Sequence, residues 1–221
     1  AKALQTLGFD VQLDETNREM TVTGLGGKIP AAKAELFIGN AGTAARFLTA
    51  FLTLGHGEYL LDGDARMRER PIGDLVEALT QLGAKLKTEN NYLPAEIYAN
   101  GLPGGKTKIA GNISSQFLSA LLMIAPYAKS PVEIELTTDL NSKPYVDMTL
   151  AVMKDFGVEV QCNSYQSFTI PLSTYRGASL RDHLPLATYP IESDASAASY
   201  FFAAPAICGG TVKVENISRN P

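Results

Sequence analysis

The residues best suited to bind a small anion stand at the starts of apolar segments. Residues 39–46 read Gly-Asn-Ala-Gly-Thr-Ala-Ala-Arg and run directly into such a segment. Glycines let a ligand approach the backbone closely, and the free amides at a helix start favour anions. The alternative is a tight turn with Thr43 as a helix cap. Arg46, the only charge in that segment, needs an acceptor, which either a structural partner or a ligand would provide.

Three arginines follow in the loop 64–71, at Arg66, Arg68 and Arg70. A loop of this kind is often only a solvated surface. However, Arg70 stands directly before a proline, and Lys143 stands before the corresponding proline 144. A cation that stands at the same position in two repeats of the sequence indicates a shared phosphate or carboxylate site. Arginine suits such a site because it can donate two hydrogen bonds to one anion.

A second helix start, at residues 112–116, offers the hydroxyls of Ser114 and Ser115 and the amide of Gln116. Capping explains one serine, and the three side chains together predict a phosphate cradle. The loop 141–145 adds the hydroxyl of Ser142, an ammonium group and the phenol of Tyr145. In a third helix start, at residues 193–196, an acidic cap suits the helix dipole and repels anions, so this aspartate is predicted to be structural.

These starts belong to a repeated plan of small-residue turn, apolar helix, strand and proline-closed loop. The three copies span residues 39–71, 111–144 and 193–221, a period too long for a solenoid and typical of stacked α/β units. Helices 43–54, 115–125 and 195–207 are apolar on nearly every face, so they are predicted to be buried all round, with Pro205 kinking or ending the last. Strands 58–61, 132–136 and 211–215 alternate more, so sheets are expected to form an outer wall.

Each copy is also expected to contain a second helix followed by a hairpin. Glycine ends the second helices at Gly8, Gly83 and Gly157. The predicted hairpins pair strands 9–13 with 19–23, 84–88 with 95–99, and 158–162 with 167–171. The repeat is broken at residues 173–191, so residues 1–190 are predicted to form a first lobe and residues 191–221 the start of a second. Both ends of the chain are expected to be cut from something longer.

Composition narrows the class of partner. A net charge of -4 without a long basic run argues against general nucleic-acid binding, so a small-molecule partner is expected. Cys162 and Cys208 are expected to be buried free thiols, and His56 and His183 to be surface residues. Neither a metal-ligand set nor a Ser-His-Asp spacing is visible. With no signal peptide and no membrane-length apolar stretch, the cytosol is the expected compartment.

Five motifs in order resemble the 5-enolpyruvylshikimate-3-phosphate synthase family. They are Gly39-Asn-Ala-Gly-Thr-Ala-Ala-Arg-Phe-Leu48, Arg66-Met-Arg-Glu-Arg-Pro-Ile72, Ser114-Ser-Gln-Phe117, Ser142-Lys-Pro-Tyr145 and Asp194-Ala-Ser-Ala-Ala-Ser-Tyr200. The resemblance implies an inside-out α/β barrel of the enolpyruvyl transferase type, in which repeated βαβαββ units bury their helices and place their sheets outside. It also implies two lobes, a monomer and no metal or organic cofactor.

The resemblance further implies a reaction, in which the enolpyruvyl group of phosphoenolpyruvate passes to the 5-hydroxyl of shikimate 3-phosphate in aromatic amino acid biosynthesis. By matching motif, Ser114, Ser115 and Ser142 would hold the shikimate phosphate, with Tyr145 placing that substrate. Gln116 would contact both substrates. Phosphoenolpyruvate would bind at Arg70 and Gly42, where the herbicide glyphosate also binds.

Some family features differ or are absent. Ala45 and Phe47 replace the Met and Pro of many members beneath Gly42. The N-terminal Lys-Ser segment and the catalytic second-lobe segment, with their proton-transfer groups, are missing, so this chain alone is expected to be inactive. Two alternatives remain. One is a non-catalytic lobe that binds a phosphorylated ligand or forms half of a split enzyme. The other is the sibling enolpyruvyl transferase that acts on a UDP-sugar and uses a loop cysteine.

Overall fold

The computed structural model describes residues 1–176, 189 and 191–217. It divides into two compact units, Ala1–Arg176 and Gly177–Pro221. The predicted linker 173–191 lies mostly outside the described residues, and the predicted lobe boundary near residue 190 stays a prediction.

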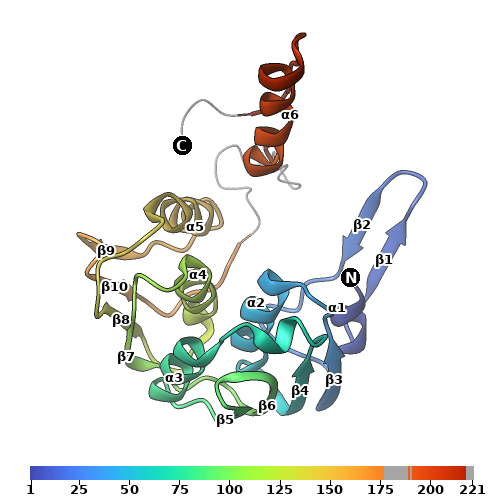
Figure 1. Ribbon diagram of the computed structural model, residues 1–221. Coiled ribbons are helices and arrows are strands. Elements are labelled where there is room, and N and C mark those ends of the chain that lie inside the picture. Colours follow the sequence, from blue (N-terminus) through green and yellow to red (C-terminus); the bar gives the residue numbers. More distant parts are fainter. Residues whose placement is uncertain (177–188, 190, 218–221) are drawn as a thin grey trace. The chain divides into compact units, whose positions relative to one another are not determined.

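The first unit contains two copies of a βαβαββ unit (Figure 1). Before them lie α1 (Lys2–Thr6), β1 (Val11–Asp14) and β2 (Glu19–Val22). The first copy is β3 (Lys33–Phe37), α2 (Gly42–Leu52), β4 (His56–Asp62), the short 3-10 helix η1 (Met67–Glu69), α3 (Gly73–Gln81), β5 (Leu86–Glu89) and β6 (Tyr92–Asn100). The second copy is β7 (Gly105–Ile109), α4 (Ser115–Ile124), η2 (Ala125–Tyr127), β8 (Val132–Leu136), α5 (Lys143–Asp155), β9 (Gln161–Asn163) and β10 (Ser167–Ile170).

Each copy forms its own four-stranded sheet, and the two sheets have the same topology. The strand orders are β3-β4-β6-β5 and β7-β8-β10-β9, with the first pair parallel and the others antiparallel. Parallel neighbours need a crossover, which α2 provides in the first copy and α4 in the second. A third, two-stranded sheet pairs β1 with β2. The βαβαββ unit implied by the family resemblance is therefore confirmed in these two copies, while closure into a barrel stays a prediction.

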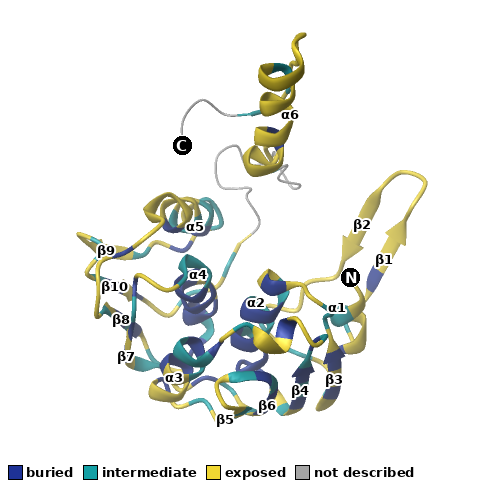
Figure 2. Ribbon diagram, in the orientation of Figure 1, coloured by how far each residue is buried: buried dark blue, intermediate teal, exposed yellow. Residues whose placement is uncertain are grey.

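The helices lie inside the unit and the sheets lie outside. α4 contacts α2, α3 and α5, and seven of its ten residues are buried (Figure 2). β3 alternates between exposed and buried positions, as a strand with one solvated face should. On the outer face of β7 and β8, Lys106 pairs with Glu133 and Lys108 with Glu135. The predicted α/β class with inner helices and outer sheets is confirmed.

Glycine ends the second helices as predicted. Gly8, Gly83 and Gly157 have φ values of 85°, 88° and 84°, which is the left-handed region that a side chain disfavours. Each of these glycines directly follows the C-cap residue of its helix, which is α1, α3 or α5. The recurring stop therefore sets where each helix gives way to its hairpin.

Several predictions for the second unit are wrong. Its helix α6 (Ala195–Cys208) has only Ala198 buried, because residues 191–217 contain no described element that packs against its apolar faces. Residues 211–215 form no strand, since no described strand is available to pair with them. The helix runs past Pro205 to Cys208, so an end at this proline is wrong and a kink stays a prediction. Cys208 is exposed rather than buried, and the same prediction is wrong for Cys162 in the first unit.

His56, the first residue of β4, is exposed, as expected of a surface residue, and His183 lies outside the described residues. Within the described part of the chain, no helix has both the length and the apolar character needed to cross a bilayer. In the same residues, no cluster of three or more His, Cys, Asp or Glu side chains could hold a metal ion.

Candidate anion-binding site

A cavity of about 510 Å³ in the first unit brings the predicted site residues together. Its wall is formed by Arg46, Arg70, Pro71, Ile113, Ser114, Ser115, Gln116, Phe117, Ser142 and Tyr145. These residues come from α2, from the loop after β4, and from the starts of α4 and α5. Of the residues predicted to bind substrate, only Gly42 is absent from the wall, and it lies directly against the Arg70 guanidinium.

The start of α4 supplies hydroxyls and free backbone amides. Ser114 is the N-cap, with extended backbone angles, and its hydroxyl accepts a hydrogen bond from the Gln116 amide at 3.3 Å. One serine therefore caps the helix, as the sequence predicts. Ser115 is the first helical residue, and its hydroxyl has no protein partner among the described residues. The N-terminus of α4, which is the positive end of its helix dipole, lies at the part of the wall that Ser114 and Ser115 form.

The start of α2 lies against a guanidinium group. A Cβ atom added at Gly42 would lie 2.5 Å from Arg70 Cζ and would overlap both terminal nitrogens of Arg70. Only a glycine lets the guanidinium approach the helix backbone this closely. The alternative interpretation, with Thr43 as the helix cap, is wrong, because Ala41 is the N-cap and makes no side-chain capping bond. The Thr43 hydroxyl instead accepts a hydrogen bond from Gln116 Nε2 at 3.3 Å, which joins the two helix starts.

The three arginines of the loop 64–71 have different surroundings. Arg66 pairs with Glu69 at 2.6 Å, and Arg68 pairs with Asp62. The hydrogen bond from Arg68 is the main reason that the pKa of Asp62 is below its ordinary value. Among the described residues no carboxylate pairs with Arg70. Arg66 and Arg68 therefore belong to a solvated surface loop, as the alternative interpretation predicts. Arg70 has no carboxylate partner among the described residues, so its charge is available to a ligand.

A second arginine, Arg46, lines the same cavity as Arg70 and is buried. Arg46 is only 7% exposed, and its guanidinium donates to the Gly42 carbonyl at 2.8 Å and lies 5.9 Å from the centre of the Phe117 ring. Its Nε atom is buried without a hydrogen-bond partner. Burial, together with the charge of Arg70, lowers the pKa of Arg46 below its ordinary value. Two neighbouring guanidinium groups, one of them desolvated, raise the positive potential of the cavity.

The start of α5 completes the wall. Ser142, its N-cap, has a φ of 58°, and its side chain makes neither a capping bond nor another hydrogen bond to the residues that the structure describes. Tyr145 is 55% exposed at the rim of the cavity. Lys143 does not join them. Its Nζ lies 5.1 Å from the centre of the Tyr165 ring, and it lines a different cavity, so the site shared by Arg70 and Lys143 is not formed.

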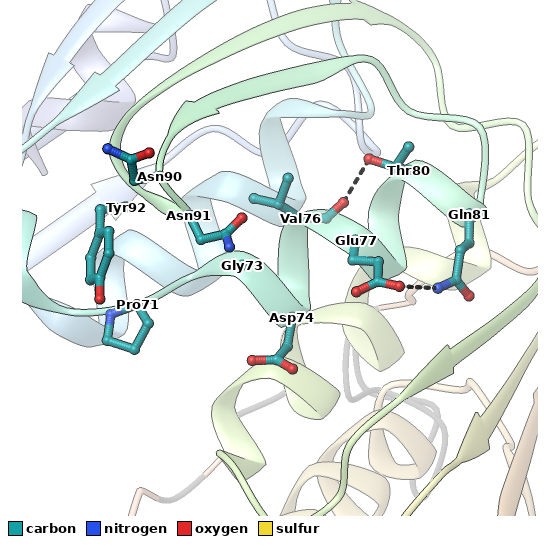
Figure 3. A pocket seen from close by; sticks show the side chains of 10 residues that line it. All are labelled: Pro71, Gly73, Asp74, Val76, Glu77, Thr80, Gln81, Asn90, Asn91 and Tyr92. Atoms are coloured by element: carbon teal, nitrogen blue, oxygen red, sulfur yellow. Dashed lines mark hydrogen bonds between the residues drawn. The ribbon is translucent and has the colours of Figure 1, made fainter.

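A larger cavity, of about 660 Å³, lies along α3 and the turn between β5 and β6 (Figure 3). Asp74 and Glu77 line it, and no lysine or arginine is among its wall residues. Its polar groups are engaged with one another, since Gln81 Nε2 donates to Glu77 Oε1 at 3.5 Å and the Thr80 hydroxyl donates to the Val76 carbonyl at 2.8 Å. Carboxylates repel anions, so size alone would point to the wrong cavity.

The residues around the smaller cavity have the chemistry that suits a phosphate or carboxylate group. They combine two guanidinium groups, three serine hydroxyls and a helix N-terminus on one surface. In the part of the chain that the structure describes, no Asp, Glu, His or Cys lines this wall, so a general acid or base of those types has to come from elsewhere.

Comparison with known proteins identifies the family. The family model for EPSP synthase (3-phosphoshikimate 1-carboxyvinyltransferase) matches residues 1–221. The chain belongs to the EPSP synthase family. It is 50% identical to the 3-phosphoshikimate 1-carboxyvinyltransferases of Marinomonas sp. (strain MWYL1) and Sulfurovum sp. (strain NBC37-1), over 99% and 98% of its own length. In both comparisons the chain spans about half the length of the relative.

The fold agrees with this assignment. EPSP synthase from Acinetobacter baumannii aligns with a TM-score of 0.71 and 22% identity, over 93% of this chain and 44% of that protein. Four wall residues were not among those predicted to bind substrate: Arg46, Pro71, Ile113 and Phe117. An unpaired arginine in an apolar helix was the one signal for Arg46. Ile113 and Phe117 flank the serine motif, and nothing in their residue types distinguishes them from core residues.

Proposed function

We propose that this chain forms the substrate-binding part of a 3-phosphoshikimate 1-carboxyvinyltransferase. The observation that carries the proposal is the cavity that joins Arg70 to Ser114, Ser115 and Ser142. In the complete enzyme the 5-hydroxyl of shikimate 3-phosphate adds to the double bond of phosphoenolpyruvate. Elimination of inorganic phosphate from the tetrahedral intermediate then leaves the enolpyruvyl ether.

The wall provides a place for each anionic group. Ser114, Ser115 and Ser142 donate hydrogen bonds to the phosphate of shikimate 3-phosphate, and Tyr145 borders its ring. Arg70 binds phosphoenolpyruvate above Gly42, because the absence of a Cβ there leaves room for the guanidinium. Gln116 reaches both ligands, since its side chain lies between the starts of α2 and α4. Fixed cations and dipoles of this kind stabilise negative charge as it moves during the reaction.

The chain alone is expected to bind the substrates and not to catalyse the transfer reaction. Catalysis needs reacting groups held together in a closed site, and the described wall contains no carboxylate or imidazole. We place the complete enzyme in the cytoplasm as a monomer that uses no metal or organic cofactor. The alternative of a non-catalytic lobe that binds a phosphorylated ligand rests on the same cavity.

Complementation separates these functions. The parts of the Marinomonas relative that this chain does not match would be supplied as separate polypeptides, and phosphate release would be measured with both substrates. Turnover that appears only in the mixture, and is lost with Arg70→Ala, supports a split enzyme. Turnover by the chain alone would contradict its expected inactivity. A mixture that remains inactive, with each polypeptide folded, favours the non-catalytic lobe.

A further inference from the structure

The two loops that carry the serine hydroxyls are joined through the side chain of Thr138. One loop runs from β7 into Ser114 and Ser115, and the other runs from β8 into Ser142. The Thr138 hydroxyl accepts hydrogen bonds from the Gly111 amide at 2.9 Å and the Asn112 amide at 3.1 Å. It also lies 3.1 Å from Asn112 Oδ1, to which it donates. One oxygen thus makes three contacts across the gap between the loops.

The preceding repeat shows why such a bridge is needed. There, β4 ends at Asp62, and the Asp64 amide, two residues later, donates directly to the Gly39 carbonyl at 3.2 Å. In the second repeat β8 ends at Leu136, and the equivalent bond, from the Asn141 amide to the Gly111 carbonyl at 3.1 Å, comes five residues later. The segment between the end of the strand and this backbone bond is therefore three residues longer after β8 than after β4, and Thr138 lies within that segment.

The bridge acts close to the site. Gly111 has little room, since a Cβ there would lie 2.8 Å from the Thr138 carbonyl oxygen, so this part of the loop is packed against its neighbour. Asn141, directly before Ser142, adds a bond from its Nδ2 to the Asn112 carbonyl at 3.2 Å. The bonds therefore end within two residues of Ser114 on one side and one residue of Ser142 on the other.

We propose that Thr138 is a positioning residue, whose hydroxyl sets the separation between Ser142 and the Ser114–Ser115 pair so that all three hydroxyls reach one phosphate group. This deepens the proposed function and rests on it. Thr138 does not line the cavity, so it acts through the loops and not through the ligand. A small displacement of one loop would leave a phosphate oxygen without a donor.

The chain offers matched controls for a test. Thr138→Val removes the hydroxyl and keeps the shape, and Thr138→Ser keeps the hydroxyl. Thr137 is the adjacent exposed threonine, and its side chain makes no hydrogen bond among the described residues, so Thr137→Val controls for the same chemical change. Titration calorimetry with shikimate 3-phosphate measures affinity, hydrogen exchange at the Gly111 and Asn112 amides reports the bridge, and urea unfolding reports stability.

The expected result is a loss of affinity of about tenfold in Thr138→Val, because a displaced serine hydroxyl loses one hydrogen bond to the charged phosphate. Exchange at the two amides should accelerate, while Thr138→Ser and Thr137→Val should resemble the parent chain in both measurements. Faster exchange with unchanged affinity would overturn the positioning role and leave the proposed function standing. A parent chain that does not bind shikimate 3-phosphate would overturn both. A loss of affinity that is fully accounted for by the fraction of unfolded protein, calculated from the urea curve, would also refute positioning.

Discussion

Gly42→Ala should weaken phosphoenolpyruvate binding by moving Arg70. The new Cβ would lie 2.5 Å from Arg70 Cζ, whereas carbon atoms in contact need about 3.5 Å, so the guanidinium has to move by about 1 Å. Losing one charge-assisted hydrogen bond to the ligand costs about 1.5 to 3 kcal/mol. This corresponds to a loss of affinity of roughly 10- to 150-fold.

The same substitution should leave the fold intact. Gly42 is the first residue of α2 and is not among the residues with positive φ, so alanine fits its backbone. Alanine also favours a helix over glycine by up to about 1 kcal/mol. Urea unfolding should therefore show stability equal to that of the parent chain or slightly higher, so lower affinity could not be attributed to unfolding.

The assay is titration calorimetry with phosphoenolpyruvate in the presence of saturating shikimate 3-phosphate. Gly24→Ala is the matched control, because a Cβ at Gly24 meets no atom within 4 Å. A double-mutant cycle with Arg70→Ala adds a second test, since the two losses should be strongly non-additive if both act through one guanidinium. Unchanged affinity in Gly42→Ala, or full additivity in the cycle, would refute the reasoning.

Three further predictions concern stability. Ser114→Ala should lower the free energy of unfolding in urea by about 1 kcal/mol, because it removes the cap of α4, while Ser115→Ala should change it by less than about 0.5 kcal/mol; equal effects would contradict the capping role. Arg46→Met should leave the unfolding free energy unchanged or raise it by about 1 kcal/mol, because a buried charge with an unpartnered Nε is replaced by an apolar chain; a loss above about 2 kcal/mol would contradict this. Burial, with a smaller effect of Tyr127, raises the pKa of Tyr175 above its ordinary value of 10.0, so stability from the neutral phenol is fully present below pH 10 and is lost as the pH rises further. Tyr175→Phe should cost about 1 kcal/mol at pH 8, from the lost bond to the Met123 carbonyl, and should decline less steeply than the parent above pH 10 in urea unfolding; parallel pH profiles would argue against a buried neutral phenol.

Local chemistry explains most of what the sequence could predict. The left-handed glycines that end α1, α3 and α5 need no tertiary information, because only glycine takes that backbone at low cost. The Asp194 cap is similarly local, since its carboxylate accepts bonds from the Ser196 and Ala197 amides at 2.8 and 3.0 Å. The apolar pattern likewise placed α4 to within one residue of its observed end.

Features that depend on tertiary neighbours were missed. β3 and β7 were not predicted, because five-residue strands with charged side chains at alternate positions resemble loops until they pair with β4 and β8. α6 was expected to be buried, yet its apolar faces have no partner in residues 191–217. The bond between Thr43 and Gln116 joins residues 73 positions apart and overrides a local capping preference. Such contacts are set by packing, which a single sequence does not specify.

The most direct test of the central claim is calorimetric titration of the 221-residue chain with shikimate 3-phosphate, alongside the Ser115→Ala variant. Ser115 lies at the wall of the cavity, and its hydroxyl is free of protein partners among the described residues. The account predicts saturable binding that weakens about tenfold in the variant, with unchanged urea stability. Absence of binding by the parent chain, or equal affinity of the two proteins, would contradict the assignment of this cavity as the phosphate site.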